Sequence, residues 1–366
     1  MLNAPRAALV VDALPAVGGA EKVLLAAMEL FPDAPIYTLV YNRKAFAHTS
    51  IASRQVITSY LDRLPLAHTQ YRKYLPLMPH AIEGFNLNQY DLLVSFSYAV
   101  AHGILTRPGQ THVSYTYTPM RYAWRKINLH GEQDGTSKVL NTLFQAFRRW
   151  DAASVLNIER FAAVSRWIAG WVEEVYHRQA KVIYPPVEVG RFTPQLERGR
   201  EFVTVSRLVA HKRVDLIVEA FNRLKLPLIV IGDGPERAHL ERRARSNIRF
   251  TGFLPDEAVS ELLGRARGFI SASVEDFGIA MVEAQAAGCP VIAIHQGGSV
   301  ETIKDGETGL FFDEQTSEHL VEAVSRCVGQ IACFDPRRIA ASVRCYNPKR
   351  FLQEFAAFAG VPVVTG

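Results

Sequence analysis

The sequence predicts an α/β protein with two doubly wound, Rossmann-like domains that face each other across a cleft. Its 366 residues exceed what one hydrophobic core usually covers, so we expect two domains. Short apolar runs alternate with amphipathic stretches in both halves, which is typical of βαβ units and parallel sheets. A segment with a proline pair, KVIYPPVEVGRFTP (181–194), indicates a linker. We therefore place the domains at residues 1–184 and 185–346, followed by a C-terminal segment at 347–366 that begins with an amphipathic helix.

The N-terminal half shows the less regular pattern. The run AALVVDA (7–13) predicts a first strand, and GGAEKVLLAAMELF (18–31) predicts a helix that begins at a glycine pair. Further strands are expected at APIYTLV (34–40), YDLLVSFS (90–97) and THVSYTY (111–117).

The C-terminal half alternates regularly. Strands are expected at FVTVS (202–206), PLIVIG (227–232), NIRFTGF (247–253), GFISAS (268–273), PVIAI (290–294) and TGLFF (308–312), and each of the first four precedes a helical pattern. Ligands of doubly wound sheets bind at the carboxyl ends of the strands, so we expect the functional residues of both domains in the cleft.

Composition describes an ordinary globular protein, with 48% hydrophobic and 21% charged residues. No window approaches the ~18 consecutive apolar residues of a membrane-spanning helix, and the start MLNAPRAALVVDAL reads as a strand rather than as a signal peptide. The four cysteines lack the CxxC spacing of metal sites, and we interpret them as reduced thiols of a cytoplasmic protein.

The positive charge lies in the N-terminal half. Residues 1–186 carry a net charge of +6, whereas residues 187–366 carry −1. Such an excess favours an anionic partner, either a membrane surface or a phosphorylated acceptor, although a solvated basic face is the alternative.

One basic and aromatic stretch, SYLDRLPLAHTQYRKYLPLMP (59–79), carries Arg63, Arg72 and Lys73. Together with FRRW (147–150) it indicates contact with a membrane surface, and a core helix with one wet edge is the alternative. We expect no nucleic-acid partner.

Two cations mark the start of the C-terminal domain. In SRLVAHKRVD (206–215), Arg207 directly follows a predicted strand and Lys212 lies at the start of the next helix. Cations at a strand–helix junction suit a diphosphate, because the helix N-terminus adds its own positive field. A pair of surface cations is the alternative.

A glycine pair opens the first helix of the N-terminal domain. Gly18 and Gly19 follow a strand and a loop, and glycines let the backbone approach a phosphate closely. A tight turn explains the pair equally well, and neither this loop nor GDGPE (232–236) has the GxGxxG spacing of dinucleotide-binding proteins.

Two acids surround an apolar helix start in SASVEDFGIAMVEAQAAGCP (271–290). Acids favour the positive end of a helix, which explains Glu275, but Glu283 falls in mid-helix, where a buried carboxylate needs a partner. If both lie on one helix, eight residues separate them by ~12 Å, enough to contact distant parts of an elongated ligand. A nucleotide sugar fits, with hexose hydroxyls at one acid and ribose hydroxyls at the other. The stretch from Phe277 through Gly278 to Ile279 would add backbone N–H groups for donor oxygens.

With these residues in place, the chain resembles the retaining GT-B glycosyltransferases of family 4 over nearly its whole length. The specific part is EDFGIAMVE followed by AQAAGCPVIA, and SRLVAHKRVDLIVEAF, IGDGPE and GGAEKVL match in order and spacing. The resemblance implies that Arg207 and Lys212 hold the donor diphosphate, that Glu283 takes the ribose and that Glu275 contacts the transferred sugar. It also implies that Gly18 and Gly19 close over the donor from the other domain, and that the last helix packs on the N-terminal domain.

The N-terminal half further resembles a branch that serves bacterial surface polysaccharide assembly and contains many mannosyltransferases. YLPLMPHAIEGFNLNQYDLLVSFSYAVAHG and YTPMRYAW carry this likeness. Relatives usually have His-Thr-Pro where this chain has Tyr-Thr-Pro at 117–119, and they tend to have His and Lys at the positions of Tyr98 and His102. The resemblance places Tyr117, Arg121 and His102 on the acceptor side.

The implied activity is transfer of a hexose, with GDP-mannose favoured as donor, to a saccharide or polyprenyl-diphosphate-linked acceptor in polysaccharide or lipopolysaccharide assembly. The implied location is the cytoplasmic side, peripheral at the inner face of the plasma membrane. Retention would follow from front-face attack, with the departing phosphate helping to take the acceptor's proton. No Asp-x-Asp motif or histidine cluster offers a metal site, so we expect neither metal nor cofactor, and the cations and helix N-termini would neutralise the leaving diphosphate.

Three other readings remain. A dinucleotide-dependent oxidoreductase would share the sheet architecture, but GxGxxG and the acid after a second strand are missing. A catalytically silent GT-B subunit that supports a partner enzyme is disfavoured by the four charged residues at 207, 212, 275 and 283. This alternative stays open because the chain has Tyr117 where relatives usually have histidine. A nucleotide-sugar epimerase would lack the paired acids of EDFGIAMVE.

Overall fold

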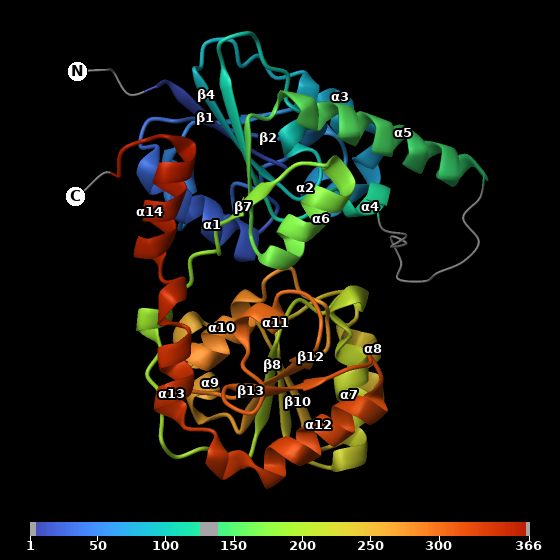
Figure 1. Ribbon diagram of the computed structural model, residues 1–366. Helices are drawn as coiled ribbons and strands as arrows, with labels where there is room; N and C mark the ends of the chain where they lie inside the picture. The colour runs from blue at the N-terminus through green and yellow to red at the C-terminus, as the bar shows by residue number, and fades with distance from the viewer. Residues whose placement is uncertain (1–4, 125–137, 364–366) are drawn as a thin grey trace. The chain divides into compact units, whose positions relative to one another are not determined.

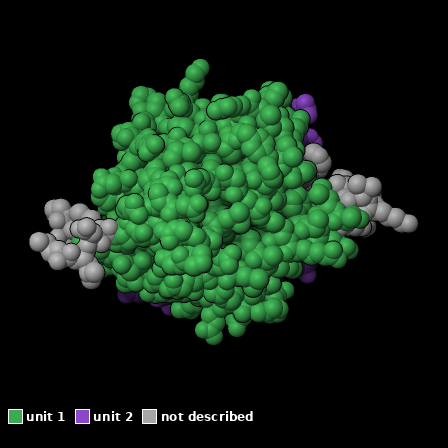
Figure 2. All heavy atoms as spheres, turned by 90° about the horizontal axis from the view of Figure 1, so that it is seen from above, with its two compact units in different colours: residues 1–186, 349–366 green, residues 187–348 purple. Residues whose placement is uncertain are grey.

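The computed structural model describes residues 5–124 and 138–363, which form two compact units (Figure 1). Unit 1 comprises residues 1–186 and 349–366, and unit 2 comprises residues 187–348, as the colours of Figure 2 distinguish. The sequence placed these boundaries two residues earlier, at 184/185 and 346/347.

Unit 1 is built on a seven-stranded, all-parallel sheet with the order β3-β2-β1-β4-β5-β6-β7. Its strands are β1 (Ala7–Val11), β2 (Ile36–Thr38), β3 (Val56–Thr58), β4 (Leu92–Ser97), β5 (Thr111–Thr116), β6 (Arg160–Ala163) and β7 (Ala180–Val182). β1, β2, β4 and β5 lie where apolar runs predicted strands. β3, β6 and β7 were not expected, and β7 begins one residue before the segment read as a linker.

Helices of varied length connect these strands. They are α1 (Gly19–Ala27), α2 (Ala67–Gln70), α3 (Met78–Glu83), α4 (Arg121–Trp124), α5 (Lys138–Ser154) and α6 (Arg166–Tyr176), with 3-10 turns η1 (Met28–Leu30), η2 (Ser50–Ser53), η3 (Tyr60–Arg63), η4 (Tyr71–Leu77), η5 (Ala101–Gly103) and η6 (Val155–Asn157). The apolar side chains of β1 and β4 are almost fully buried beneath them.

Unit 2 holds a six-stranded parallel sheet with the order β10-β9-β8-β11-β12-β13. The strands are β8 (Phe202–Val205), β9 (Leu228–Ile231), β10 (Ile248–Gly252), β11 (Gly268–Ser271), β12 (Val291–Ile294) and β13 (Gly309–Phe312), and all six lie where the sequence predicts them. The helices are α7 (Val214–Leu224), α8 (Arg237–Arg243), α9 (Asp256–Arg265), α10 (Ile279–Ala286), α11 (Ser299–Thr302), α12 (Ser317–Gly329) and α13 (Pro336–Ser342), with turns η7 (Val189–Arg191), η8 (Ala210–Lys212), η9 (Ile331–Cys333) and η10 (Arg344–Tyr346).

The strand order locates a switch point in each sheet. In unit 2 the chain runs outward from β8 to β10 and then returns to β11 on the other side of β8. In unit 1 it runs from β1 to β3 and returns to β4 beside β1. The loops after β8 and β11, and those after β1 and β4, therefore diverge and leave a crevice where such folds bind ligands.

The last helix, α14 (Pro348–Ala359), belongs to unit 1, as the family resemblance implies. Its Phe355 stacks on Phe96 of β4 with ring centroids 5.7 Å apart, and its Phe351 meets Tyr115 of β5 edge to face at 5.9 Å. Arg350 donates to the carbonyl of Tyr184 at 2.8 Å. The aromatic contacts bury this face of the helix against the sheet, which is why the chain returns to unit 1.

Candidate functional site

The switch point of unit 2 holds an ion pair. Lys212 ends the turn after β8, and Glu275 lies in the loop after β11, so the neighbouring strands bring them together from 63 positions apart. The Lys212 ammonium donates to both carboxylate oxygens at 2.7 Å, and each side chain is 21% exposed. The pair is thus partly shielded from water yet still open to a ligand.

The surroundings keep Glu275 in its charged form. Burial by itself would raise the pKa of this carboxyl group, but the Lys212 ammonium, a hydrogen bond from the Ser273 hydroxyl at 2.5 Å and the field of His211 together hold the pKa below its usual value. An ionised carboxylate can accept hydroxyl hydrogen bonds and can stabilise positive charge.

Arg207 lies in the same loop as Lys212 but is exposed. Among the residues that the structure describes, its guanidinium makes no hydrogen bond or ion pair, whereas the Lys212 ammonium is paired with the Glu275 carboxylate. The α7 helix begins at Val214, after Arg213 has turned the chain with a φ of +51°. Lys212 is therefore in the turn that precedes the helix rather than in its first turn.

The two acids do not share a helix, so the predicted 12 Å separation along one helix is wrong. α10 begins at Ile279, and Gly278 precedes it with a φ of +93°, a conformation that favours glycine. Glu275 lies before the helix in extended backbone that bridges to Gly297. Glu275 therefore lies in the loop before α10, and Glu283 lies within α10.

The start of α10 presents open backbone donors. In the described part of the chain, the N–H groups of Gly278 and Ile279 have no hydrogen-bond acceptor. The Phe277 side chain is buried against Tyr346, with ring centroids 5.2 Å apart, so only its backbone can serve a ligand. Oriented N–H groups at a helix start attract anionic oxygens, as the sequence predicted.

Glycines let the loops of this site pack backbone against backbone. A Cβ on Gly298 would lie 2.3 Å from Cα of Phe277, and one on Gly297 would lie 2.5 Å from the carbonyl oxygen of Glu275. The Gly298 N–H donates to that carbonyl at 2.8 Å. The loop after β12 thus fixes the backbone of Glu275, a role that sequence reasoning missed although the Gly-Gly pair was visible.

Glu283 has a partner that sequence reasoning also missed. Its residue is 9% exposed, and it accepts a hydrogen bond from Arg191 of η7 at 3.0 Å. The linker residue Arg191 therefore compensates the buried mid-helix carboxylate. No local pattern signals this contact, because the two residues are 92 positions apart.

In unit 1, the loop after β1 has the predicted form. Gly18 precedes α1, whose first residue is Gly19. Tyr117, at the end of β5, donates its hydroxyl to the carbonyl of Ala20 at 2.7 Å. Burial raises the pKa of Tyr117 well above its usual value, so its hydroxyl stays protonated and ties the end of β5 to the start of α1.

His102 is a core residue rather than an open acceptor contact. Its side chain has no exposed surface, and its ring nitrogens lie 2.8 Å from Ser97 Oγ and 2.8 Å from the Asp151 carboxylate. Asp151 also accepts from Trp124 and Tyr176. An acceptor cannot reach His102 unless this network opens, which corrects the expectation for this residue.

The other predicted acceptor-side residue, Arg121, is half-buried in α4.

At the unit 1 switch point, Asp12 accepts hydrogen bonds from the backbone N–H groups of residues 98–101, at 2.5 to 3.1 Å. This carboxylate braces the loop after β4.

The segment 59–79 is not one amphipathic helix but a series of short turns, η3, α2 and η4. Arg63, Arg72 and Lys73 are exposed, and so are Leu66 and Leu77, by 62% and 43%. In FRRW (147–150), Phe147 is buried and Trp150 donates to Glu83 at 2.6 Å, so this part contributes to packing. Within the described ranges, no helix has the length and apolarity needed to cross a membrane.

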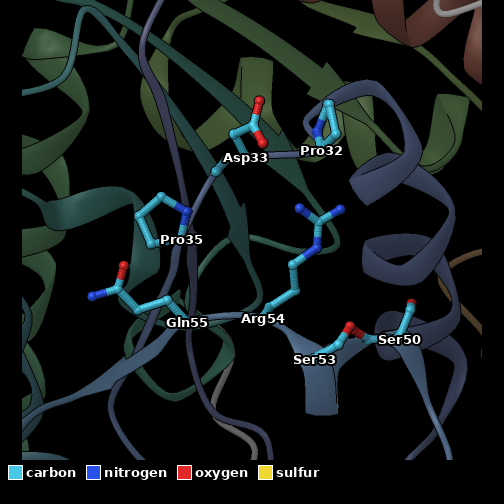
Figure 3. Close-up of a pocket in the computed structure, with 8 residues that line it drawn as sticks. Pro32, Asp33, Pro35, Ser50, Ser53, Arg54 and Gln55 are labelled. Atoms are coloured by element: carbon cyan, nitrogen blue, oxygen red, sulfur yellow. The ribbon is translucent and has the colours of Figure 1, made fainter.

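Other candidate sites are few. Among the described residues, no group of three or more His, Cys, Asp or Glu side chains is placed to hold a metal ion. A hollow of about 380 Å³ in unit 1 is lined by Pro32, Asp33, Ala34, Pro35, Ser50, Ser53, Arg54 and Gln55 (Figure 3). It lies where β2 and β3 begin, at the edge opposite to the carboxyl ends of the strands.

Residues 191–329 match the family model described as "Glycosyl transferases group 1". The matched range includes Arg191, Arg207, Lys212, Glu275 and Glu283, so the charged residues of the unit 2 site lie within it.

Curated relatives match part of the chain. A GDP-mannose-dependent alpha-(1-6)-phosphatidylinositol monomannoside mannosyltransferase of Mycolicibacterium smegmatis is 33% identical over 43% of this chain and 48% of its own length. An O-antigen chain mannosyltransferase C of Escherichia coli is 31% identical over 34% of this chain and 36% of its own length. The chain thus spans about half or less of the length of these relatives.

Solved structures match almost the whole chain. Sucrose-phosphate synthase from Thermosynechococcus elongatus has a TM-score of 0.76 at 16% identity, over 96% of this chain and 98% of its own. Anabaena Alr3699/HepE in complex with UDP has a TM-score of 0.71 at 17% identity, with the same coverage. The fold is therefore the two-domain, Rossmann-like GT-B fold.

Proposed function

We propose that this protein is a retaining hexosyltransferase of family 4 that uses a nucleotide-diphosphate sugar, with GDP-mannose favoured as donor. The observation that carries the proposal is the cluster of Arg207, Lys212 and Glu275 at the switch point of unit 2, inside the range that matches the glycosyl transferases model. A cation pair and an ionised carboxylate at this point suit a diphosphate next to a sugar.

Arg207 and Lys212 would hold the donor diphosphate. Arg207 is exposed, and the N–H groups of Gly278 and Ile279 lie open at the start of α10. Lys212 would divide its hydrogen bonds between Glu275 and a phosphate oxygen. These donors are in place before reaction, which is the condition for electrostatic stabilisation of a leaving group.

Glu275 would contact the transferred sugar, and Glu283 would accept hydrogen bonds from the ribose. Glu275 belongs to the loop beside the cations, and Glu283 lies further along α10. Sugar and ribose flank the diphosphate on opposite sides in a nucleotide sugar, so two acids separated in this way match its two ends. The charge of Glu275 would stabilise the sugar as it becomes cationic.

Transfer with retention requires attack on the face that the diphosphate leaves. The bond between the anomeric carbon and the phosphate oxygen breaks, the acceptor oxygen bonds to the same face, and the acceptor's proton passes to the departing phosphate. Arg207 and Lys212 would stabilise the negative charge of that phosphate, so the proposed reaction needs no divalent metal.

Mannose and a surface-polysaccharide acceptor are the favoured substrates. The Mycolicibacterium relative is named for GDP-mannose and a phosphatidylinositol mannoside acceptor, and the E. coli relative is named for the O-antigen chain. By analogy, the acceptor would be a saccharide or a polyprenyl-diphosphate-linked saccharide. The enzyme would act as a peripheral protein on the cytoplasmic face of the plasma membrane.

A donor screen tests the proposal. Thermal unfolding should be followed with GDP-mannose, UDP-glucose and ADP-glucose, each at increasing concentration, because a ligand that binds only the folded state raises Tm with saturation. We expect GDP-mannose to raise Tm most, and we expect the shift to persist in EDTA. Transfer of labelled mannose to polyprenyl-linked acceptor should survive EDTA as well.

The outcomes separate the alternatives. A Tm shift with NAD(H) and none with any sugar nucleotide would support the oxidoreductase. A donor shift without transfer to any acceptor would support the catalytically silent subunit. Dependence of transfer on added Mg²⁺ or Mn²⁺ would contradict the metal-independent mechanism.

A further inference from the structure

We propose that Arg191 is a positioning residue for the nucleotide donor, and that it acts by clamping Glu283. This inference rests on the proposed function, because it concerns the acid assigned to the ribose. It adds a residue from the linker to a site that is otherwise built from the loops and helices of the sheet.

The geometry of the clamp is specific. Arg191 Nη2 donates to Glu283 Oε1 at 3.0 Å, and Nη1 donates to Asp256, the first residue of α9. The guanidinium carbon lies 4.5 Å from the centroid of the neighbouring Phe192 ring. One planar cation therefore joins α10, α9 and the linker turn η7, and the ring limits its movement.

Burial makes the contact to Glu283 the important one. The Glu283 side chain is 12% exposed and that of Arg191 is 25% exposed, whereas that of Asp256 is 63% exposed. A carboxylate with so little exposed surface needs a cation, because water could not compensate its charge if Arg191 were removed. The exposed arm to Asp256 is worth much less, since water competes for it.

Arg191 also has an unused donor. Its Nε is buried and has no hydrogen-bond partner among the described residues. Arg191 thus uses its two terminal nitrogens for carboxylates of two helices and leaves Nε unpaired.

The consequence concerns the ribose. An acid in such a fold recognises ribose by accepting hydrogen bonds from its hydroxyls, and that contact requires a fixed carboxylate orientation. Arg191 supplies the orientation and the compensating charge before the donor arrives. Loss of the clamp should therefore lower the affinity for those donors that bind through their ribose hydroxyls.

The test pairs a protein change with a ligand change. Calorimetry should measure the affinity of GDP and of 2′,3′-dideoxy-GDP for the wild type and for Arg191→Gln, Arg191→Lys and the control Arg265→Gln. Arg265 forms an exposed ion pair with Glu261 of the same helix α9, so it controls for loss of a surface cation. Inorganic pyrophosphate, which has no ribose, controls for folding of the diphosphate site.

We expect Arg191→Gln to lower the affinity for GDP about tenfold or more, because the charged hydrogen bond that holds Glu283 is lost. The dideoxy analogue and pyrophosphate should bind the wild type and the variant equally. Arg191→Lys should recover part of the affinity, and Arg265→Gln should bind like the wild type. In a transfer assay, Arg191→Gln should raise KM for the donor far more than it changes kcat.

The double variant Arg191→Gln/Glu283→Gln provides a second readout. If Arg191 acts through Glu283, the double variant should bind GDP no more weakly than Glu283→Gln alone. Additive losses would overturn the proposal, and so would an equal loss of GDP and pyrophosphate, which would show a general structural role.

Failure of the inference differs from failure of the proposed function. If the wild type binds GDP and discriminates against the dideoxy analogue, but Arg191→Gln does the same, the clamp is overturned and the donor site stands. If the wild type binds none of GDP, UDP and ADP, both are overturned.

Discussion

At the scale of single residues, the ion pair between Lys212 and Glu275 sets the charge of the site before any ligand binds. The carboxylate is neutralised by a cation at 2.7 Å, and the nearby Arg207 provides the exposed charge. The unliganded site is thus attractive to a diphosphate without leaving a buried charge unpaired. Glu275 and Glu283 should then have different roles, one towards the sugar and one towards the ribose.

The two acids can be separated by experiment. Glu283→Gln should weaken the bare nucleoside diphosphate, because a charged acceptor for ribose hydroxyls is lost. Glu275→Gln should leave that affinity almost unchanged but lower transfer, since its contact strengthens as the sugar becomes cationic. Calorimetry with GDP and a transfer assay with GDP-mannose distinguish the two. Equal losses of GDP affinity would show that the acids do not divide the ligand.

Residue chemistry could be predicted only where it follows from a local pattern. Arg207 and Lys212 were predicted as site residues because a strand end and a helix start lie close together in the sequence. Arg191 and Ser273, which contact the two acids, were not found. The first acts across 92 positions, and the second becomes a partner only because Glu275 leaves the helix. The resemblance placed His102 on the acceptor side, and the sequence alone does not show that its side chain is buried.

At the scale of elements, segment 59–79 shows how prolines alter an amphipathic pattern. Pro65 lies between η3 and α2, and Pro76 lies inside the 3-10 turn η4, so the segment folds as short turns instead of one α-helix. The turns still expose the cations Arg63, Arg72 and Lys73 beside apolar Leu66 and Leu77. Exposed cations beside exposed apolar side chains suit contact with a membrane surface, whereas the alternative, a core helix with one wet edge, does not describe these turns.

We predict binding to vesicles that contain anionic lipid, with release by salt, because the attraction between charges is screened. Replacement of Arg63, Arg72 and Lys73 by glutamine should weaken this binding in a vesicle-flotation assay. The exposed cations Arg43 and Lys44 of unit 1, replaced together by glutamine, provide a control. Equal binding to neutral vesicles, or no change in the triple variant, would argue against a membrane role for this segment.

Element type was predictable where apolar runs are long and buried. All six strands of unit 2 lie where the sequence predicts them, because each is an apolar run and the first four each precede a clear helical pattern. β3 and β7 were missed because each has three residues, all of them half-exposed or exposed, which gives no strong apolar signal. The assumption that both acids lie on one helix was wrong, because Gly278 precedes α10 with a left-handed backbone and leaves Glu275 outside the helix.

At the scale of the whole molecule, one buried histidine of unit 1 makes the stability of the fold sensitive to acid. His112 of β5 is 1% exposed, and burial lowers its pKa to about 3. Ser95 Oγ lies 2.9 Å from His112 Nε2, while Nδ1 has no partner among the described residues. The folded state therefore keeps this histidine neutral.

The sign of the pH effect follows from linkage. In the unfolded chain this histidine takes up a proton near pH 6.5, whereas in the folded protein it does so only near pH 3. Its contribution to stability is complete above pH 6.5 and is lost as the pH falls, by at most about 1.4 kcal/mol per pH unit. Urea unfolding between pH 7 and pH 4 should show a steeper decline for the wild type than for His112→Asn. The exposed His48→Asn serves as control, and identical slopes for wild type and His112→Asn would contradict the assignment.

The central claim is that Arg207 and Lys212 bind the diphosphate of a nucleotide sugar. Arg207→Ala, Lys212→Ala and the double variant should be compared with Arg213→Asn, which removes a neighbouring cation that already pairs with Asp215. Arg207→Ala should leave Tm unchanged, because the side chain is exposed and its guanidinium makes no hydrogen bond or ion pair with the described residues. Lys212→Ala should lower Tm modestly, since Glu275 loses its partner.

The most direct measurement is transfer from GDP-mannose, with GDP affinity measured by calorimetry on the same variants. Each single alanine variant should lower kcat by about 10²–10³-fold, as expected for loss of a donor to a charged leaving group. The double variant should no longer bind GDP, and Arg213→Asn should behave like the wild type. Near-normal transfer by both single variants, with GDP affinity intact, would contradict the account.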